Sequence, residues 1–390
     1  MMDADERIFR NLESFSKVQF VLLKLGTLCN ATKSRLFSEA ECDTGRVKDG
    51  ETPIAVNFSL IFQPGLSLLK DIRDGKKKTL PNHEKSAIRK LDEYLKVSEQ
   101  HEKCLKKVLI RQQPLEKETV TVAVTEHLLG KLAPGGSCII NENGRELVCC
   151  QCGCNERPVY SYTGIGHQDV WHGYTDIVFE SHDGIPVCIA TTQVSSLSSS
   201  CAILDQSSPA KRPRIEDDDE FEEDIISEAS ILPAERTEDQ AIAQIIVFSL
   251  LQRQKHPEYQ HHLVPNIVIS PTDFQIFMYD AVNDILLGSY PLLLFDVETE
   301  SLRIESVMIL WMVLHYRMFC EGIKVDELTD DFKNFDMKSH FRKIVGRKWD
   351  VYSTALSENI SYFSPAKKRS SLTFDSNWFA KELTYKNTSN

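Results

Sequence analysis

A stretch near the middle of the chain constrains the fold most, because it cannot contribute to a packed core. Residues 195–224 run through SSLSSS and SSPAKRPRIE and end in EDDDEFEED, which has eight acidic side chains and no basic one. Such a composition buries too little apolar surface to offset the loss of chain entropy on folding. Apolar patterns resume on both sides of it. We therefore expect a disordered linker that interrupts folded sequence.

The remaining composition is that of an ordinary globular protein. The chain has 390 residues, 42% hydrophobic and 26% charged, with a net charge of −12 that comes largely from the acidic run. The overall balance argues against nucleic-acid binding over the whole surface, but it does not exclude a local basic groove. No apolar run approaches the ~20 residues that span a bilayer. The acidic start MMDADERIF is not a secretory signal, so we expect eleven reduced cysteines and no membrane partner.

The first third of the chain predicts a helical domain over residues 1–115. Apolar residues recur there at three- and four-residue spacing, at Ile8, Leu12, Phe15, Val18, Leu22 and Leu25. Further helices are expected around 60–72 and from Asn82 onward, with a turn at residues 74–78 between them.

The hydrophobic pattern changes near Thr119 from helical spacing to short strand-like runs, and it predicts an α/β domain over residues 119–321. Strands are expected at TVTVAV, DIVFES and IPVCIATTQV, then at NIVIS, FQIFMYD and DILLGSY after the linker. Helices are expected from Thr237 and over residues 302–319. Residues 322–390 form a polar extension, and its tail after residue 364 is expected to be disordered.

One motif in the α/β domain places a carboxylate at the start of a strand. Gly164-Ile-Gly166 leads to Asp176, which opens the apolar run IVF, and a turn and a second apolar strand follow. The simplest interpretation is a hairpin with an aspartate at its edge. The order of elements around this motif indicates more than a hairpin, because a helix, three strands, a helix with glutamines and a further strand follow one another. The chain in this respect resembles the divergent members of the PD-(D/E)XK nuclease superfamily.

The resemblance implies a mixed-sheet, restriction-endonuclease-like core that binds Mg²⁺ or Mn²⁺ and hydrolyses phosphodiesters of nucleic acid. Asp176 matches the metal-binding aspartate. The E-x-K motif, whose two side chains share one face of a strand, is degenerate here. Strand IPVCIATTQV offers Ala190 and Thr192, or Thr191 and Gln193, whereas SEAS after the linker offers Glu228 with Ser230 in the lysine position. We take Glu228 as the second metal ligand, because it directly precedes the glutamine helix.

Three further residues are candidates for this site. The helical acid of the family corresponds to Glu126, for which an exposed helix glutamate is the plainer interpretation. Gln240 and Gln244, one turn apart, either point at the site or flank the apolar helix face. Because the motif lysine is absent, the sequence leaves open whether the domain is a weakened metal-dependent nuclease or an inactive one.

A cluster of cysteines is a second candidate site. Cys149, Cys152 and Cys154, completed by His167 or else by His172 or Cys138, form an alternative zinc set, in which only Cys149 and Cys152 have the C-x₂-C spacing. No second pair with this spacing exists in the sequence. We therefore expect buried reduced thiols here rather than zinc.

The linker contains a basic cluster of the kind that directs proteins to a cell compartment. The basic cluster Lys211-Arg212-Pro213-Arg214 in an extended, polar stretch is typical of a nuclear localisation signal that an import receptor reads. The sequence thus predicts a nuclear protein of one of two classes. The first is a nuclease-like enzyme that acts on nucleic acid. The second is an inactive binding or scaffold protein on the same fold, which contacts protein partners through its helical domain and acidic linker.

Overall fold

The computed structural model describes most of the two regions expected to fold. The described residues are 14–44, 54–76, 79–110, 115–142, 149–154, 156, 158–181, 185–194, 233–258, 263–323 and 336–360. The expected linker at 195–224 with its localisation signal, the candidate Glu228, and the tail after residue 364 lie outside these residues. Within the described part, no helix has the length and apolarity needed to cross a membrane.

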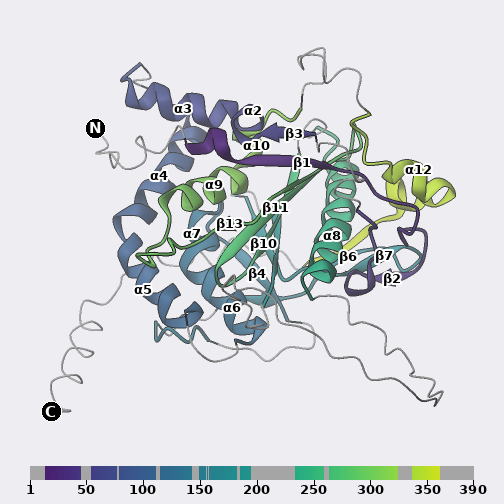
Figure 1. Ribbon diagram of the computed structural model, residues 1–390, viewed down its shortest axis with the longest axis horizontal. Coiled ribbons are helices and arrows are strands. Elements are labelled where there is room, and N and C mark those ends of the chain that lie inside the picture. The colour runs from purple at the N-terminus through teal and green to yellow at the C-terminus, as the bar shows by residue number, and fades with distance from the viewer. Residues whose placement is uncertain are drawn as a thin grey trace, which may run out of the picture.

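One large mixed sheet runs through the molecule (Figure 1). In spatial order, its strands in the described part are β3 (Ala55–Asn57), β1 (Gln19–Leu23), β12 (Ile285–Ser289), β11 (Asp273–Asp280), β10 (Val264–Ile269), β9 (Pro186–Thr192), β8 (Ile177–Glu180), β4 (Cys138–Asn141) and β5 (Tyr160–Ser161), with β13 (Leu292–Leu293) paired to β11. Neighbouring strands are antiparallel except β9 with β10 and β4 with β5. Every residue of β9 and β10 is buried, which is expected of strands that helices cover on both faces.

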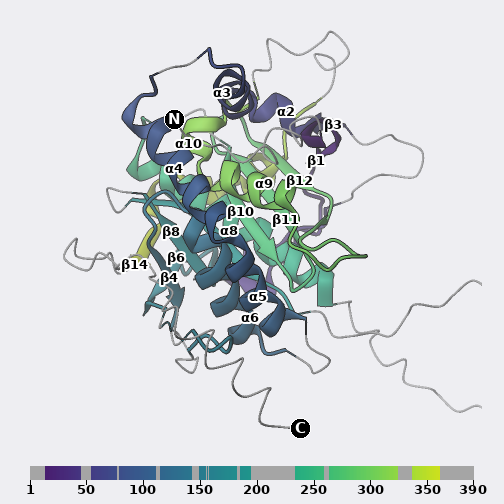
Figure 2. The ribbon, with the colours of Figure 1, turned by 90° about the vertical axis from the view of Figure 1, so that its left-hand side faces the viewer.

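Helices cover both faces of this sheet, as the two perpendicular views show (Figures 1 and 2). One face carries α4 (Asn82–Lys96), α5 (Ser98–Leu109), α6 (Lys117–Val124), the π-helix η3 (Thr125–Leu129), α7 (Gly130–Leu132) and α9 (Ile304–Leu314). The other face carries the long helix α8 (Pro233–Lys255), which packs on β10 and β11. The short helices η1 (Ser14–Lys17), η2 (Phe37–Glu39), α2 (Phe58–Ile61), α3 (Gln63–Arg73) and α10 (Tyr316–Phe319) complete these layers.

A smaller sheet lies beside α8. Its strands, in spatial order, are β14 (Ser357–Ile360), β6 (Thr163–Gly166), β7 (Trp171–Tyr174) and β2 (Arg35–Leu36). The last helices lie on the same side of the molecule as this smaller sheet. They are α12 (Phe341–Val345), η5 (Gly346–Lys348) and the π-helix η6 (Val351–Ala355). The buried Trp171 joins this sheet to the amino-terminal region, since its Nε1 donates a 2.8 Å hydrogen bond to Asn30 Oδ1.

The expected α/β class is confirmed, and several expected elements are present. The helices near 60–72 and from Asn82 form, and so do the strands after the linker and the buried helix α9. The central elements follow the order helix (α6–η3–α7), β4, β8, β9, α8, β10, in which β4, β8 and β9 are antiparallel and β10 is parallel to β9. The sheet takes strands from both sides of the expected boundary near residue 119.

Two expected elements are wrong. In the described part of the expected helix over residues 8–25, Gln19–Leu23 is strand β1, held between β3 and β12. Its last four residues are buried, and a short run of buried apolar residues does not separate a strand from a helix by spacing alone.

The second wrong element is the expected strand at TVTVAV, which is the helix α6. All six residues are buried, so their alternation carried no information about a solvent face. The hydroxyl of Thr121 donates a 2.8 Å hydrogen bond to the carbonyl of Lys117, the back-bonding by which threonine is accommodated inside a helix.

Candidate metal centre

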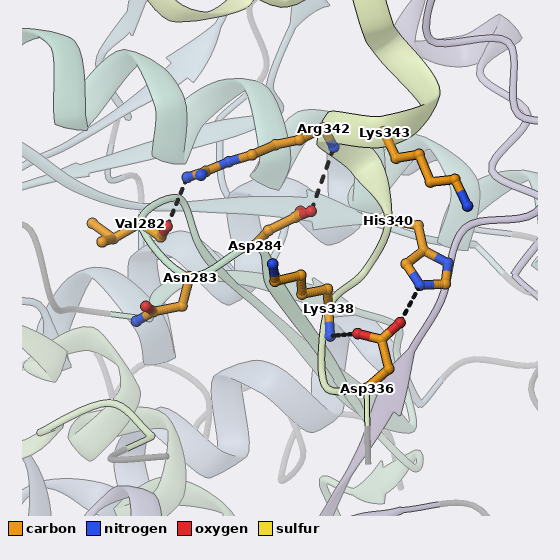
Figure 3. Close-up of a pocket in the computed structure, with 8 residues that line it drawn as sticks. All are labelled: Val282, Asn283, Asp284, Asp336, Lys338, His340, Arg342 and Lys343. Carbon is orange, nitrogen blue, oxygen red and sulfur yellow. Dashed lines mark hydrogen bonds and ion pairs between the residues drawn. The ribbon is translucent and has the colours of Figure 1, made fainter. Parts of the chain in front are cut away.

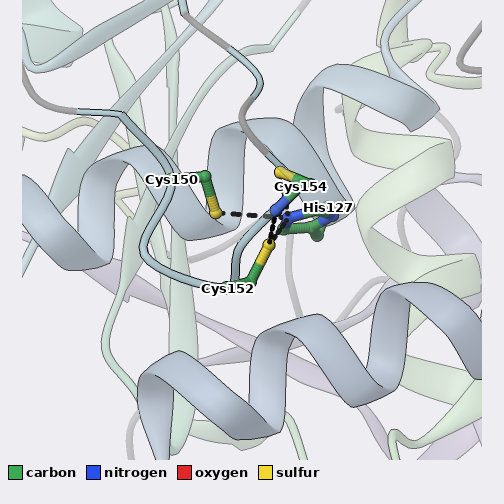
Figure 4. A group of neighbouring side chains, drawn as sticks. All are labelled: His127, Cys150, Cys152 and Cys154. Atoms are coloured by element: carbon green, nitrogen blue, oxygen red, sulfur yellow. Dashed lines mark hydrogen bonds between the residues drawn. The ribbon is translucent and has the colours of Figure 1, made fainter. Parts of the chain in front are cut away.

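Four side chains with metal-binding atoms converge under helix α6 and its continuation η3 (Figure 4). They are His127 from η3 and Cys150, Cys152 and Cys154 from the segment that follows β4. Their ligand atoms all lie within 4.8 Å of one another. Three of the four residues are buried and Cys154 is half-buried. Among the described residues, this is the one group of three or more His, Cys, Asp or Glu side chains close enough to hold a metal ion.

A tight turn over residues 151–154 directs the cysteines to one point. Gly153 has a φ of 96°, a conformation that a side chain would strain, so glycine at this position lets the chain reverse between two cysteines. The backbone N–H of Cys154 donates to Cys152 Sγ at 3.3 Å. Gln151 Nε2 donates a 3.0 Å hydrogen bond to Thr119 Oγ1, which ties the turn to α6.

His127 is placed by the π-helical turn in which it lies. Insertions of this kind in helices are frequent at functional sites, because they rotate a side chain out of the regular helical register. The hydroxyl of Tyr94 donates to the carbonyl of His127 at 3.2 Å. The ring of His101, stacked on Tyr94, brings its Nδ1 to 3.3 Å from His127 Nδ1. His127 therefore has a partner for Nδ1 and directs Nε2 at the cysteines.

The spacing of the four ligand atoms suits a tetrahedral ion. His127 Nε2 lies 3.3 Å from Cys150 Sγ, 3.1 Å from Cys152 Sγ and 3.6 Å from Cys154 Sγ. Zinc bonds of ~2.0 Å to nitrogen and ~2.3 Å to sulfur at tetrahedral angles imply separations of roughly 3.5 Å between these atoms. Three cysteines and one histidine form a complete set for structural zinc.

The electrostatics of the cluster favour a thiolate. Hydrogen bonds from the thiols of Cys104 and Cys150 hold the pKa of Cys152 well below its usual range. The same contacts with Cys152 raise the pKa values of Cys150 and Cys104. Burial lowers the pKa of His101 to about 3, so its ring is neutral and its Nδ1 can accept a hydrogen bond from His127 Nδ1–H. Such an outer partner fixes the orientation of a metal-binding histidine.

This geometry corrects the expected cofactor. The sequence favoured Mg²⁺ or Mn²⁺ and reduced thiols over zinc, and that expectation is wrong. The compact site holds sulfur and imidazole ligands, which zinc prefers, whereas Mg²⁺ and Mn²⁺ prefer oxygen ligands. The alternating Cys150-x-Cys152-x-Cys154 was the available signal in the sequence, and the C-x₂-C template passes over it.

The structure brings together half of the alternative zinc set. Cys152 and Cys154 belong to the cluster, but Cys149 is exposed and is not part of it. His167 lies in the turn between β6 and β7, where its Nδ1 accepts a hydrogen bond from the backbone of Asp169. Sequence reasoning missed His127, since no local pattern links a histidine in an apolar helix to cysteines beyond the next strand.

Asp176 forms a different kind of buried centre at the start of β8. Its Oδ2 accepts hydrogen bonds from the backbone N–H of Thr192 at 2.8 Å and from Thr192 Oγ1 at 3.2 Å. The ammonium of Lys117, at the start of α6, lies 2.8 Å from the same oxygen. Thr121 Oγ1 lies 2.7 Å from Thr192 Oγ1, which completes a link from α6 to β9. The carboxylate is therefore already paired with a cation and two donors.

The other candidates for the nuclease-like site do not join Asp176 in a metal-binding group within the described residues. Glu126 is buried in η3, not exposed on a helix surface. Gln240 is half-buried on α8. Gln244 is fully buried, accepts a 2.6 Å hydrogen bond from Thr191 Oγ1 and donates to the carbonyl of Tyr174 at 2.9 Å. Glu228, the expected second ligand, lies outside the described residues.

Comparison with known proteins assigns the chain to no group. It matches no protein-family model, no curated protein and no solved structure.

Proposed function

We propose that this protein is a non-catalytic binding or scaffold protein of the nucleus, built on a nuclease-like α/β core that a structural zinc ion holds together. The single observation that carries the proposal is the state of Asp176. Its carboxylate is buried and already paired with Lys117 and Thr192. A hydrolytic core needs this carboxylate to bind a catalytic ion.

The order of elements supports the resemblance to the PD-(D/E)XK superfamily. The resemblance rests on the order helix, three strands, helix and strand. In the central sheet this order is formed by the helical run α6–η3–α7, then β4, β8 and β9, then α8 and β10. Strand β8 is antiparallel to both β4 and β9, and β10 is parallel to β9. Asp176 begins β8, and Gln244 on α8 reaches the neighbouring strand β9. In the E-x-K places β9 offers Ala190 and Thr192 or Thr191 and Gln193, none of which has a carboxylate or ammonium group, and the preferred Glu228 lies outside the described residues.

The zinc centre supports a structural role in place of a catalytic one. Catalytic zinc keeps one coordination position open for water or substrate, whereas structural zinc has four protein ligands. His127, Cys150, Cys152 and Cys154 fill all four positions in a site that is buried or half-buried. A metal bound there links η3 to the segment after β4, and it contributes its binding free energy to folding.

The nuclear location rests on the sequence alone. Lys211, Arg212 and Arg214 provide the basic cluster, and the acidic run that follows suits contact with basic protein partners. A variant with alanine at these three positions, fused to a fluorescent protein, is expected to lose nuclear accumulation. An unchanged nuclear fraction would contradict this part of the proposal.

The absence of catalysis is tested directly on the zinc-loaded protein. Labelled single- and double-stranded DNA and RNA are incubated with it in the presence of added divalent ions, beside the variant Asp176→Asn. We expect no cleavage above the level of the variant. Cleavage that requires Asp176 would overturn the proposal and assign the core to active nucleases.

A further inference from the structure

A polar pocket is lined by residues that take no part in the metal centre. It has a volume of about 570 Å³ and opens between the turn that joins β11 to β12 and the segment that leads into α12 (Figure 3). Charged and polar side chains dominate its lining, namely those of Asn283, Asp284, Asp336, Lys338, His340, Arg342 and Lys343. A cavity of this size is in the range that holds a small molecule.

The two carboxylates of the pocket are engaged in holding its walls. Asp284 Oδ1 accepts hydrogen bonds from the hydroxyls of Tyr279 at 2.8 Å and Ser339 at 2.6 Å. Asp336 Oδ2 lies 2.5 Å from His340 Nε2, and its Oδ1 accepts from the backbone N–H of Lys338. Both acids therefore fix the positions of neighbouring groups of the wall.

The cations of the pocket differ in how far they are engaged. Arg342 donates to the carbonyls of Ala281 and Val282 and lies over the ring of Trp349, so it is fixed as part of the wall. Lys338 and Lys343 are exposed, and among the described residues neither ammonium group has a hydrogen-bond or ion-pair partner. The lining has three cations, Lys338, Arg342 and Lys343, against two carboxylates, so positive charge is in excess there.

The backbone around the pocket is strained at two places that line it. Asp284 has a φ of 60° and His340 a φ of 66°, values that residues other than glycine rarely adopt. Conformations of this kind cluster at ligand-binding sites, where the surrounding structure holds them. Asp284 is held by Tyr279 and Ser339, and His340 by Asp336.

We propose that this pocket binds a small, phosphate-dense anion, with Lys338 and Lys343 as the groups that contact the phosphates. Ammonium groups on flexible stems bind phosphate as point charges. The described residues that line the pocket include three cations and the imidazole of His340, which Asp336 holds, but no Phe, Tyr or Trp ring. A single-stranded nucleic acid would use such a ring for base stacking. The lining therefore favours a compact polyphosphate over a polynucleotide.

The test compares a pocket variant with a matched surface variant. Titration calorimetry of the zinc-loaded protein with inorganic tripolyphosphate and with ATP is performed on wild type, on Lys338→Ala/Lys343→Ala and on Lys70→Ala/Lys85→Ala. The control pair removes two equally exposed lysines from α3 and α4, away from the pocket. Thermal melting of all three proteins verifies that they fold.

We expect both probes to bind wild type and the control with similar affinity, because the triphosphate and not the base is recognised. Affinity should fall about tenfold or more in the pocket variant and weaken steeply between about 50 mM and about 200 mM salt. If the probe removed zinc from the protein, the heat of that reaction would also appear with the pocket variant. Only heat that is lost in the pocket variant is therefore assigned to binding in the pocket.

Three results would overturn the proposal. Neither probe binds, or both bind the pocket variant as tightly as wild type, or a labelled oligonucleotide binds through Lys338 and Lys343 while tripolyphosphate does not. The last result would assign the pocket to nucleic acid. Because the pocket shares no residue with the metal centre or with Asp176, each of these results is independent of the proposed function.

Discussion

Two buried polar centres lie along one helical run and differ in what completes them. At the start of α6, Lys117 supplies a cation to the carboxylate of Asp176. At the other end, in η3, His127 meets the sulfur atoms of Cys150, Cys152 and Cys154. Buried charge is stable only when it is paired, and the first centre is paired by the protein itself. The second gathers nitrogen and sulfur atoms in an arrangement that could hold a metal ion.

This difference separates two roles that the sequence alone did not distinguish. Asp176, which the sequence resemblance assigns to metal binding, has the contacts of a structural ion pair, which joins α6 to β8 and β9. The cysteines resemble ordinary buried thiols in sequence but have the geometry of a metal site. The following predictions test this contrast, from the largest expected effect to the smallest.

The strongest test replaces each of two adjacent cysteines by serine in separate variants. Cys150→Ser should remove bound zinc, measured by elemental analysis, and lower the free energy of unfolding by several kcal/mol. The apparent binding free energy of structural zinc is on the order of 10 kcal/mol, and a site that lacks one ligand retains only part of it. Cys149→Ser is the matched control, since Cys149 is exposed, and should retain one zinc per chain. Equal metal content in the two variants would refute the ligand assignment.

The ion pair is tested by removal of its cation. Lys117→Ala leaves the buried Asp176 carboxylate without its ammonium partner and should lower the free energy of unfolding by about 2 kcal/mol. The value is at the low end for buried pairs, because the side chain of Lys117 is 32% exposed. Lys117→Arg, which keeps the charge, should retain most of the stability in urea denaturation.

Wild type and Lys117→Ala also test whether the Asp176 centre and the metal centre are independent of each other. Zinc content should stay unchanged in Lys117→Ala, because no ligand of the metal contacts Lys117. Loss of zinc in this variant would show that the centres are coupled through α6 and would remove the contrast between them.

The histidine behind the metal ligand should tune affinity without changing stoichiometry. His101→Phe preserves a ring on Tyr94 but removes the nitrogen that faces His127 Nδ1. Loss of such an outer partner lowers metal affinity roughly 10- to 100-fold. Competition with a chromogenic chelator measures this. His167→Phe, at the histidine that the sequence favoured, should leave the affinity at the wild-type value.

Glu180 is a third kind of buried polar group and gives the smallest expected effect. One of its oxygens accepts from Ser137, and the other has no hydrogen-bond partner among the described residues. Burial raises the pKa of Glu180 from 4.5 to about 6. The folded state therefore binds the proton more tightly than the unfolded state, so its stability declines as pH rises from about 4.5 through 6.

Glu180→Gln removes this titration. The variant should melt on the order of 2 °C above wild type at about pH 8, and the difference should vanish near pH 4, where both unfolded and folded wild type carry the proton. Metal release in acid is common to both proteins and cancels in the difference. A difference that is constant with pH would show that Glu180 does not titrate in this range.

Much of the fold could be predicted from local pattern. The hairpin after Asp176, the helix from about residue 237 and the strands after it follow from periodicity and turn residues, which act between near neighbours. Periodicity failed where a run of successive residues is buried, as at Phe20–Leu23 of β1 and Thr119–Val124 of α6, because no solvent face remains there to mark the difference between strand and helix.

The sequence by itself determined the α/β class, the concentration of cysteines near residue 150 and the carboxylate at the start of β8. Tertiary structure decided which of these could do chemistry. It brought His127 to Cys150 in place of His167 to Cys149, and it set Lys117 against Asp176. Both outcomes depend on contacts between segments that are far apart in the chain, whose approach is governed by the packing of helices on the sheet.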